Sequence, residues 1–108
     1  MKKYSLHLVL WIHHKNDRGE NPIYIKITID RKTSYIATGY HILPKFWDKK
    51  NELVKNTYKL HQHINPGITN KKNQVSQKIV ELQVAGKNSS AKEVKAIFSS
   101  GKNMLNFF

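Results

Sequence analysis

Residues 23–42 read IYIKITIDRKTSYIATGYHI, and this stretch sets the architecture around which the rest of the chain is organised. Its first seven residues alternate strictly, with isoleucine at every second position and Tyr24, Lys26 and Thr28 between the isoleucines. Because successive side chains of a strand point to opposite faces, the pattern predicts a strand over residues 23–29 with one apolar face and one polar, basic face. In a chain with a formal net charge of +12, a basic face suits a polyanionic partner.

The second half of this stretch predicts an antiparallel hairpin with a two-residue turn at Asp30-Arg31. With that turn, Lys26 lies opposite Tyr35. The preceding residue, Ile25, then lies opposite Ile36, so that the apolar and the polar faces of the two strands coincide. Asp30-Arg31 lacks the glycine that tight hairpins prefer. A register shifted by one residue is therefore an open alternative, and it would exchange the two faces of the third strand.

The segments around the hairpin predict one more strand and a corner. A first strand is expected over residues 4–13, followed by a polar loop that contains a glycine and a proline. The third strand is expected to end at Thr38-Gly39. The apolar segment 42–48 is expected to close one edge of the core, and residues 49–58 give no confident element.

The C-terminal half predicts two helices. A long helix is expected over residues 68–85, because Asn65-Pro66-Gly67 blocks extension upstream and Gly86 ends the helix. Ser90-Ala91-Lys92-Glu93 is a capping box that opens a shorter helix, which Gly101-Lys102-Asn103 ends. The predicted fold class is therefore α+β, a three-stranded antiparallel sheet packed against a helix, with a short C-terminal helix.

The composition points to nucleic acid as the first candidate partner. The 108 residues suffice for one domain, and 19 lysines and arginines face 7 acidic residues. An anionic membrane surface and simple solubility are the alternatives. Seventeen of the basic residues are lysines, which favours point-charge contacts with phosphates. There is no cysteine, and no apolar run approaches the roughly 20 residues of a membrane span, so a cytoplasmic location without a membrane partner is expected.

Metal binding and catalysis are not expected of this chain. His13-His14 would point to opposite faces of a strand, while His61 and His63 have no acidic residue close enough in sequence to complete a ligand set. The chain has no glycine-rich phosphate loop and no paired carboxylates, so neither a cofactor nor a small-molecule substrate is expected. Trp11 and Trp47 lie in apolar sequence and are expected in the core, with base stacking as the alternative.

The order of these segments has a counterpart among known modules. A glycine-containing loop leads into the second strand at residues 19–28, the hairpin ends Tyr35-Ile36-Ala37-Thr38-Gly39-Tyr40-His41-Ile42, and Pro44-Lys45-Phe46-Trp47-Asp48 follows. Together these pieces resemble the N-terminal arm-type DNA-binding domain of tyrosine recombinases, the phage-type integrases of mobile genetic elements. The resemblance covers residue 4 to about residue 100.

The resemblance implies that the sheet lies in the major groove of double-stranded DNA at arm-type sites. It assigns the reading face to Tyr24, Lys26 and Thr28 of the second strand and to Thr33, Tyr35 and Ala37 of the third, with Arg31 and Lys32 at the hairpin tip near a phosphate. Tyrosine recombinases need a nucleophilic tyrosine among arginines and histidines. This chain has only Arg18 and Arg31, so it is expected to be non-catalytic.

The resemblance also divides the chain. Residues 1–100 would be the arm-type domain, and residues 101–108 would be a linker and the start of a missing core-binding domain. Docking of the apolar tail Met104-Leu105-Asn106-Phe107-Phe108 on this core is the alternative.

The complete protein is expected to bind further recombinase subunits and to support DNA integration and recombination. The rival function is a protein-interaction module whose basic face meets an acidic partner or another recombinase subunit.

Overall fold

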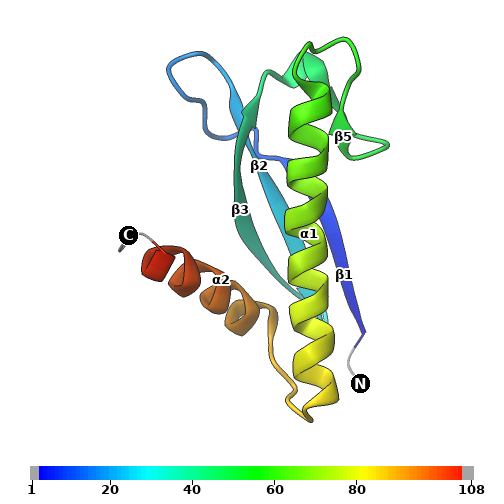
Figure 1. Ribbon diagram of the computed structural model, residues 1–108, viewed down its shortest axis with the longest axis vertical. Coiled ribbons are helices and arrows are strands. Elements are labelled where there is room, and N and C mark those ends of the chain that lie inside the picture. Colours follow the sequence, from blue (N-terminus) through cyan, green and yellow to red (C-terminus); the bar gives the residue numbers. More distant parts are fainter. Residues whose placement is uncertain (1–2, 106–108) are drawn as a thin grey trace.

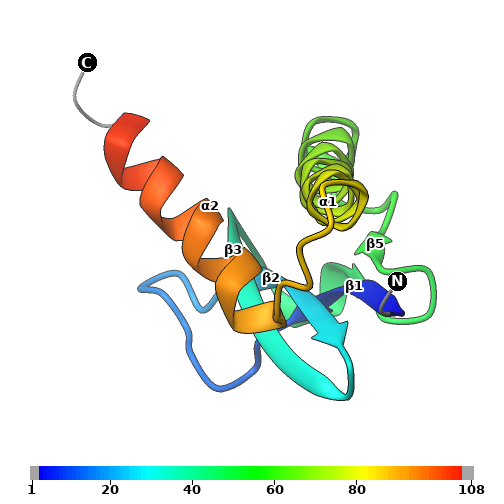
Figure 2. The ribbon, with the colours of Figure 1, turned by 90° about the horizontal axis from the view of Figure 1, so that it is seen from below.

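The computed structural model describes the backbone of residues 3–105 and the side chains of residues 3–98. Its elements are β1 (Tyr4–Leu10), β2 (Asn21–Ile29), β3 (Lys32–Ile42), a 3-10 turn η1 (Pro44–Phe46), β4 (Trp47–Asp48), β5 (Leu53–Val54), α1 (His61–Val84) and α2 (Ala91–Leu105). The first three strands form an antiparallel sheet in the order β1-β2-β3, and β4 pairs with β5. Helix α1 runs along one face of the sheet and α2 lies beside β3 (Figures 1 and 2). The predicted α+β class is confirmed.

The hairpin between β2 and β3 has the register that the sequence predicts with a turn at Asp30-Arg31. Lys26 pairs with Tyr35 and Ile25 pairs with Ile36. The turn forms without glycine because Asp30 and Arg31 both adopt positive φ angles, 53° and 67°, as a type I′ turn requires. The alternative register is excluded, and the two faces of β3 stand as predicted.

The isoleucine face of the sheet forms the core with α1. Every isoleucine of β2 is at most 2 % exposed, and Leu8 of β1 and Ile36 of β3 are buried beside them. Four side chains of α1 cover this face, namely Ile64, Ile68, Val75 and Ile79. A buried side chain of this size stabilises the fold by roughly 1.5–3 kcal/mol through the hydrophobic effect.

Helix α1 begins at His61, seven residues before the predicted start, and Pro66 lies inside it. A proline removes one backbone hydrogen bond and is normally unfavourable inside a helix. Here the neighbouring Asn65 compensates, because its side-chain amide accepts from the backbone N–H of Val54 at 2.8 Å and donates to the Val54 carbonyl at 3.0 Å. This pair of bonds fixes the first turns of α1 to β5, which the local sequence rule could not anticipate.

Helix α1 is only weakly amphipathic, because some of its contacts with the sheet are made by glycine and serine and not by apolar side chains. Gly67 lies against the Tyr40 ring, where any Cβ would overlap the ring, so only glycine permits this close approach. Further along the helix, the Ser76 hydroxyl lies 2.9 Å from the Tyr4 hydroxyl. The helix ends at Val84, one residue before the predicted end, and Gly86 follows with a φ of 82° while the Lys87 N–H donates to the Leu82 carbonyl.

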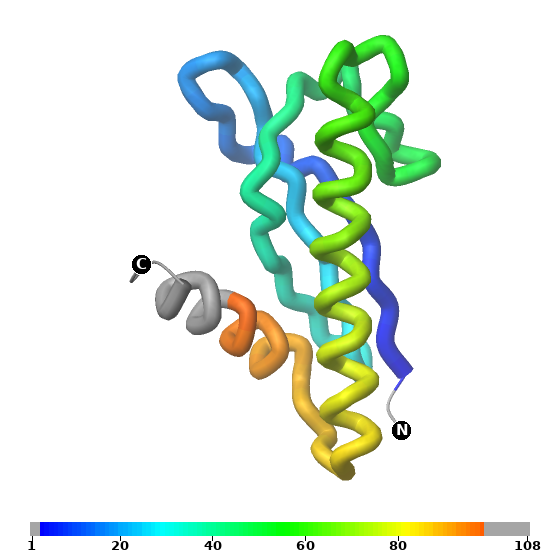
Figure 3. The backbone as a smooth tube through the Cα atoms, in the orientation of Figure 1, coloured from blue at the N-terminus to red at the C-terminus, as the bar shows by residue number. Residues whose placement is uncertain are grey.

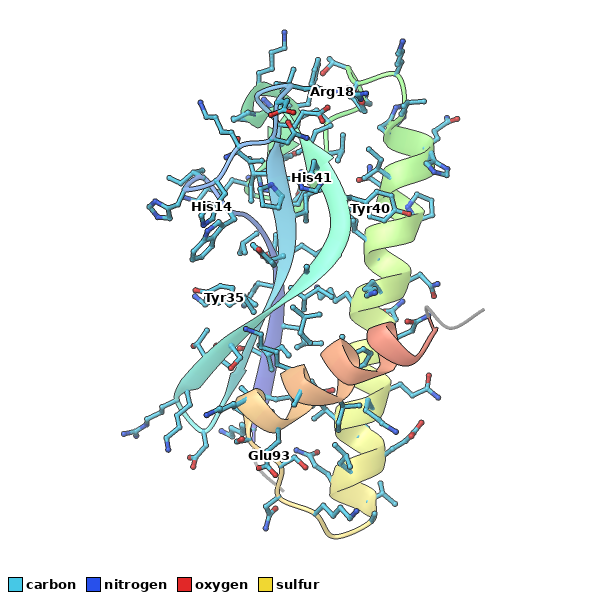
Figure 4. All side chains as sticks on the ribbon, turned by 90° about the vertical axis from the view of Figure 1, so that its left-hand side faces the viewer. His14, Arg18, Tyr35, Tyr40, His41 and Glu93 are labelled. Atoms are coloured by element: carbon cyan, nitrogen blue, oxygen red, sulfur yellow. The ribbon has the colours of Figure 1, made fainter. Side chains whose placement is uncertain are left out.

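Strand β3 continues past Thr38-Gly39, where the sequence predicts its end. The pairing register shifts between Pro22 and Tyr24, which marks a bulge, and Gly39 takes the positive φ of 88° there. The buried Thr38 hydroxyl donates to the Ile23 carbonyl at 2.7 Å. The extra residues leave the alternation intact, so Tyr40 still points toward α1 (Figure 4).

Strand β1 is shorter than predicted and a second hairpin is present. The strand ends at Leu10 rather than at residue 13, and Ile12 is 65 % exposed. Strands β4 and β5 form a hairpin whose turn and second strand, β5, lie within residues 49–58, where no element is predicted. Its turn is organised by Asp48, whose pKa is lowered by hydrogen bonds from the backbone N–H and the side-chain amide of Asn51.

Helix α2 opens with the predicted capping box. The Ser90 N–H donates to Glu93 Oε1 at 3.0 Å, and the Glu93 N–H donates to Ser90 Oγ at 3.2 Å. Its buried residues Ala91 and Val94 join the core. The helix runs through Gly101-Lys102-Asn103, where an end is predicted, because one glycine costs only about 1 kcal/mol in a helix interior. Residues 106–108 of the predicted linker and tail lie outside the described residues, as do the side chains of residues 99–105.

Candidate nucleic-acid interface

The sheet face opposite α1, called the outer face below, brings together the residues predicted to bind DNA. Pairing in register places these outer-face residues side by side: His7 and Val9 on β1, Tyr24, Lys26 and Thr28 on β2, and Thr33, Tyr35 and Ala37 on β3. In Figure 4, Tyr35 points away from α1. Arg31 lies in the hairpin turn, and Lys32 is the first residue of β3. All eight predicted residues therefore lie on one face or at its tip, and their contacts with DNA stay a prediction.

The dimensions of this face match those of a nucleic-acid groove. Neighbouring strands lie about 4.8 Å apart, so the backbones of β1 and β3 are separated by about 10 Å. The major groove of B-DNA is about 12 Å wide and admits a β-ribbon. In the described part of the chain, no helix covers this face, because α1 occupies the other side and α2 lies along β3 (Figure 2). A three-stranded ribbon is therefore presented with its side chains free to enter a groove.

An aromatic cluster occupies the end of the outer face near the loop between β1 and β2. The ring of Trp11 lies 5.7 Å from that of Tyr24 and 5.1 Å from that of Tyr35, measured between centroids, with interplanar angles of 88° and 60°. The two tyrosine rings are 6.4 Å apart. Rings at these distances and angles make edge-to-face contacts, which hold them in fixed positions.

Trp11 was predicted to lie in the core, and this prediction is wrong. Trp11 is half-buried on the outer face, whereas Trp47 belongs to the buried cluster as predicted. The position of Trp11 on this face was missed, although the alternation of residues in the first strand indicated it. Counting from His7 and Val9, the next residue on the same face is Trp11. The apolar character of tryptophan outweighed that periodicity in the prediction.

Asn21 fixes the chain segment that carries Trp11. Its side chain is fully buried, and its amide donates to the Trp11 carbonyl at 3.0 Å and to the His14 carbonyl at 2.7 Å. The Trp11 N–H donates to the Pro22 carbonyl, after which the chain leaves the sheet. The loop therefore starts in a defined conformation, and His14 points to the same side of the sheet as Tyr35 (Figure 4).

Cations are distributed around the outer face. Surface hollows beside it place Lys95 of α2 near Ala37, and Lys49 near Lys26. At the hairpin tip, Lys3 and Arg31 share a third hollow. Figure 3 shows that this tip and the loop between β1 and β2, which carries Lys15 and Arg18, lie at opposite ends of the sheet. Cationic side chains therefore lie at both ends and both edges of the polar and aromatic centre, among a few acidic ones, where they could contact phosphates that flank a groove.

The free edge of β1 is covered by Glu52 from the turn between β4 and β5. Glu52 accepts from the Leu8 N–H at 3.0 Å and from His7 Nδ1 at 2.8 Å. Partial burial raises the pKa of Glu52, but the hydrogen bonds from Leu8 and His7 outweigh it, so the pKa lies below its ordinary value. The carboxylate of Glu52 is thus kept ionised at the edge of β1, where both of its oxygens are engaged by that strand.

Metal binding and membrane crossing are two further questions for the described residues. Within residues 3–98, no three histidine, aspartate or glutamate side chains gather closely enough to hold a metal ion. Neither of the two helices, as far as they are described, has the length and apolar character to cross a membrane. His61 and His63 lie on α1, not on an extended segment.

Comparison with known proteins adds one finding. Residues 9–95 match the family model of an arm DNA-binding domain. No curated protein and no solved structure matches the chain. The matched range contains β2, β3 and α1 in full, as well as Trp11 and Lys95.

Proposed function

The chain belongs to the arm DNA-binding domain family, the N-terminal domain type of phage integrases, and on this basis we propose that its outer face binds duplex DNA sequence-specifically at arm-type sites. One observation carries the proposal. Six of the predicted reading residues stand on a three-stranded face that no described helix covers, and Lys95, Lys49, Lys3 and Arg31 lie beside this face. The face enters the major groove, where side chains of β2 and β3 contact base edges and the surrounding lysines contact phosphates.

In the complete protein, this domain serves a site-specific tyrosine recombinase together with other recombinase subunits. The domain is non-catalytic, and its contribution is to tether a catalytic domain to a second DNA site. Such a tether raises the effective concentration of the catalytic domain into the millimolar range when the linker spans the gap. Deletion of residues 1–100 from the complete recombinase should abolish arm-site binding and leave cleavage of an isolated core-type site detectable.

A salt titration with matched variants tests the DNA-binding proposal. If about four to six phosphates are neutralised, log K for a duplex should fall with log salt at a slope of about −4 to −5. Lys26→Ala removes a charge from the outer face, and Lys78→Ala removes one from α1, where Lys78 lies 3.8 Å from Glu81. Lys26→Ala should weaken specific binding by about 1–3 kcal/mol, and Lys78→Ala should have little effect.

The same titration distinguishes duplex DNA binding from the rival function, a protein-interaction module with a basic face. Single-stranded RNA of equal charge serves as the comparison polyanion and should bind less tightly than the duplex. A slope near zero, or equal losses for Lys26→Ala and Lys78→Ala, would exclude the outer face as the DNA-binding surface. A basic face that serves an acidic protein would then account better for the charge.

A further inference from the structure

A hollow on the outer face combines aromatic walls with a small floor and a cationic rim. It measures about 450 Å³ and is lined by Trp11, His14, Tyr24, Tyr35, Ile36, Ala37 and Lys95. Ala37 is exposed and lies opposite Tyr24 in the pairing of β2 with β3. Because alanine ends at Cβ, the space above it is bounded by the three rings and stays open to solvent.

Resting on the proposed function, we propose that this hollow reads the C5-methyl group of a thymine in the major groove, while Lys95 contacts a neighbouring phosphate. The methyl group of thymine is the apolar group that base edges present in the major groove, and it is recognised by apolar contact with alanine or aromatic side chains. Ala37 and the rings supply such a surface. Guanine and cytosine present no methyl group to it, and their main major-groove atoms are the hydrogen-bonding groups N7, O6 and N4.

The ring geometry favours contact with a base edge over stacking on a base face. Binding a splayed base between two rings would require a parallel pair with a gap between them. The three rings instead meet at interplanar angles of 60–88° and contact one another, so they leave no parallel slot. A methyl group that projects from an intact base pair fits the shared edge of such a cluster, and the duplex stays paired.

The hollow is built by residues that are held in place before any DNA arrives. Asn21 binds the carbonyls of Trp11 and His14, so the loop that carries these side chains starts in one conformation. Tyr24 projects from the central strand β2 and Tyr35 from β3, which is paired with β2. A preorganised surface loses little conformational entropy on binding, which favours discrimination by a contact as small as one methyl group.

Lys95 reaches the hollow from α2, and the fold fixes its position. The preceding residue, Val94, is fully buried in the core, and the capping box at Ser90 sets where the helix begins. Lys95 itself is exposed. A point charge at the rim of a hollow that receives a base edge lies where the sugar–phosphate backbone of that base pair passes, so it adds affinity without reading sequence.

The test uses the full chain and duplexes that it selects from a random-sequence library. In the tightest selected duplex, each thymine is replaced in turn by deoxyuracil, which removes one methyl group and keeps the base pair. Replacement at one position should weaken binding about 3- to 10-fold, because one apolar group loses its contact. The remaining replacements serve as internal controls and should have smaller effects.

Two variants link that position to the hollow. Trp11→Ala removes one wall, and Ala37→Leu fills the floor at an exposed position where the fold tolerates a larger side chain. Either variant should bind the thymine and deoxyuracil duplexes equally well. Lys95→Gln should keep the discrimination and reduce the salt slope by about 1.

The outcomes are distinguishable. Selection of a duplex in which no thymine is sensitive to deoxyuracil would overturn this inference and leave the proposed function intact. Discrimination that persists in both Trp11→Ala and Ala37→Leu would also overturn it. Failure to enrich any duplex would instead contradict the proposed function itself.

Discussion

The two faces of the sheet consist of alternate residues of the same strands, yet they are built on opposite rules. On the inner face every isoleucine of β2 is almost completely buried beneath α1. On the outer face Tyr24, Lys26 and Thr28 are only half-buried, and in the described part of the chain no helix lies over them. The inner face determines the geometry of the sheet, and the outer face uses that geometry to present side chains at fixed spacing. Neighbouring residues in the sequence therefore differ in purpose, one stabilising the fold and the next available to a ligand.

The adjacent pair Ile25 and Lys26 gives the largest expected contrast. Ile25→Ala should lower the free energy of unfolding by about 2–5 kcal/mol, because it leaves a cavity beneath α1. Lys26→Ala should leave it within about 0.5 kcal/mol and should weaken duplex binding. Urea denaturation measures the first effect and duplex titration the second. If Lys26→Ala unfolded the domain while Ile25→Ala folded normally, the assignment of the two faces would be wrong.

Two asparagine amides, of which Asn21 is fully buried and Asn65 partly buried, give an intermediate effect that sharpens the comparison. Asn21 holds the backbone beside the outer face, and Asn65 bridges α1 to β5 on the inner side. Asn21→Ala and Asn65→Ala should each destabilise the domain by about 1–3 kcal/mol, because backbone groups lose their partners.

Affinity for a selected duplex distinguishes these two variants. Only Asn21→Ala should lower it, because only Asn21 positions Trp11. Titration below the melting temperature of both variants measures this. Equal affinities would show that the loop conformation has no influence on binding.

The elements that depend on local sequence were predictable, and those that depend on distant contacts were not. Strict alternation gave both faces of β2, and the turn at Asp30-Arg31 gave the register of β3. The start of α1 was missed because Asn65 finds its partner in Val54, eleven residues earlier in the chain. The hairpin of β4 and β5 was missed for the same reason, since Glu52 bonds to β1.

The residues of the candidate site also fall into those predictable from local sequence and those that depend on distant contacts. The residues of β2 and β3 were predicted because each alternates with a buried neighbour. Trp11 was missed because its environment comes from Tyr24 and Tyr35 on two other strands. Lys95 was not singled out among seventeen lysines, because its place beside Ala37 arises from the packing of α2 against β3. Charge alone does not say which lysine faces a groove.

The smallest expected effect concerns the free edge of β1, where Glu52 accepts hydrogen bonds from His7 and Leu8. The folded protein lowers the pKa of Glu52 below its ordinary value of 4.5. The ionised carboxylate therefore stabilises the fold above about pH 4.5, and this contribution is lost as the pH falls through the lowered pKa of the folded state. Because the carboxylate is partly exposed, the contribution should be less than about 1 kcal/mol.

Glu52→Gln should therefore reduce the loss of stability between pH 6 and pH 3, as followed by urea denaturation at a series of pH values. Glu81→Gln is the matched control, because it makes the same change in charge on an exposed part of α1. It should leave the pH dependence close to that of the unmodified chain. A pH dependence that Glu52→Gln leaves unchanged would mean that the hydrogen bonds at the edge of β1 add no net stability. The β4–β5 hairpin would then be held by the burial of Trp47 and Val54 and by the two bonds between Asn65 and Val54, and the contact of Glu52 would cover the edge of β1 without stabilising it.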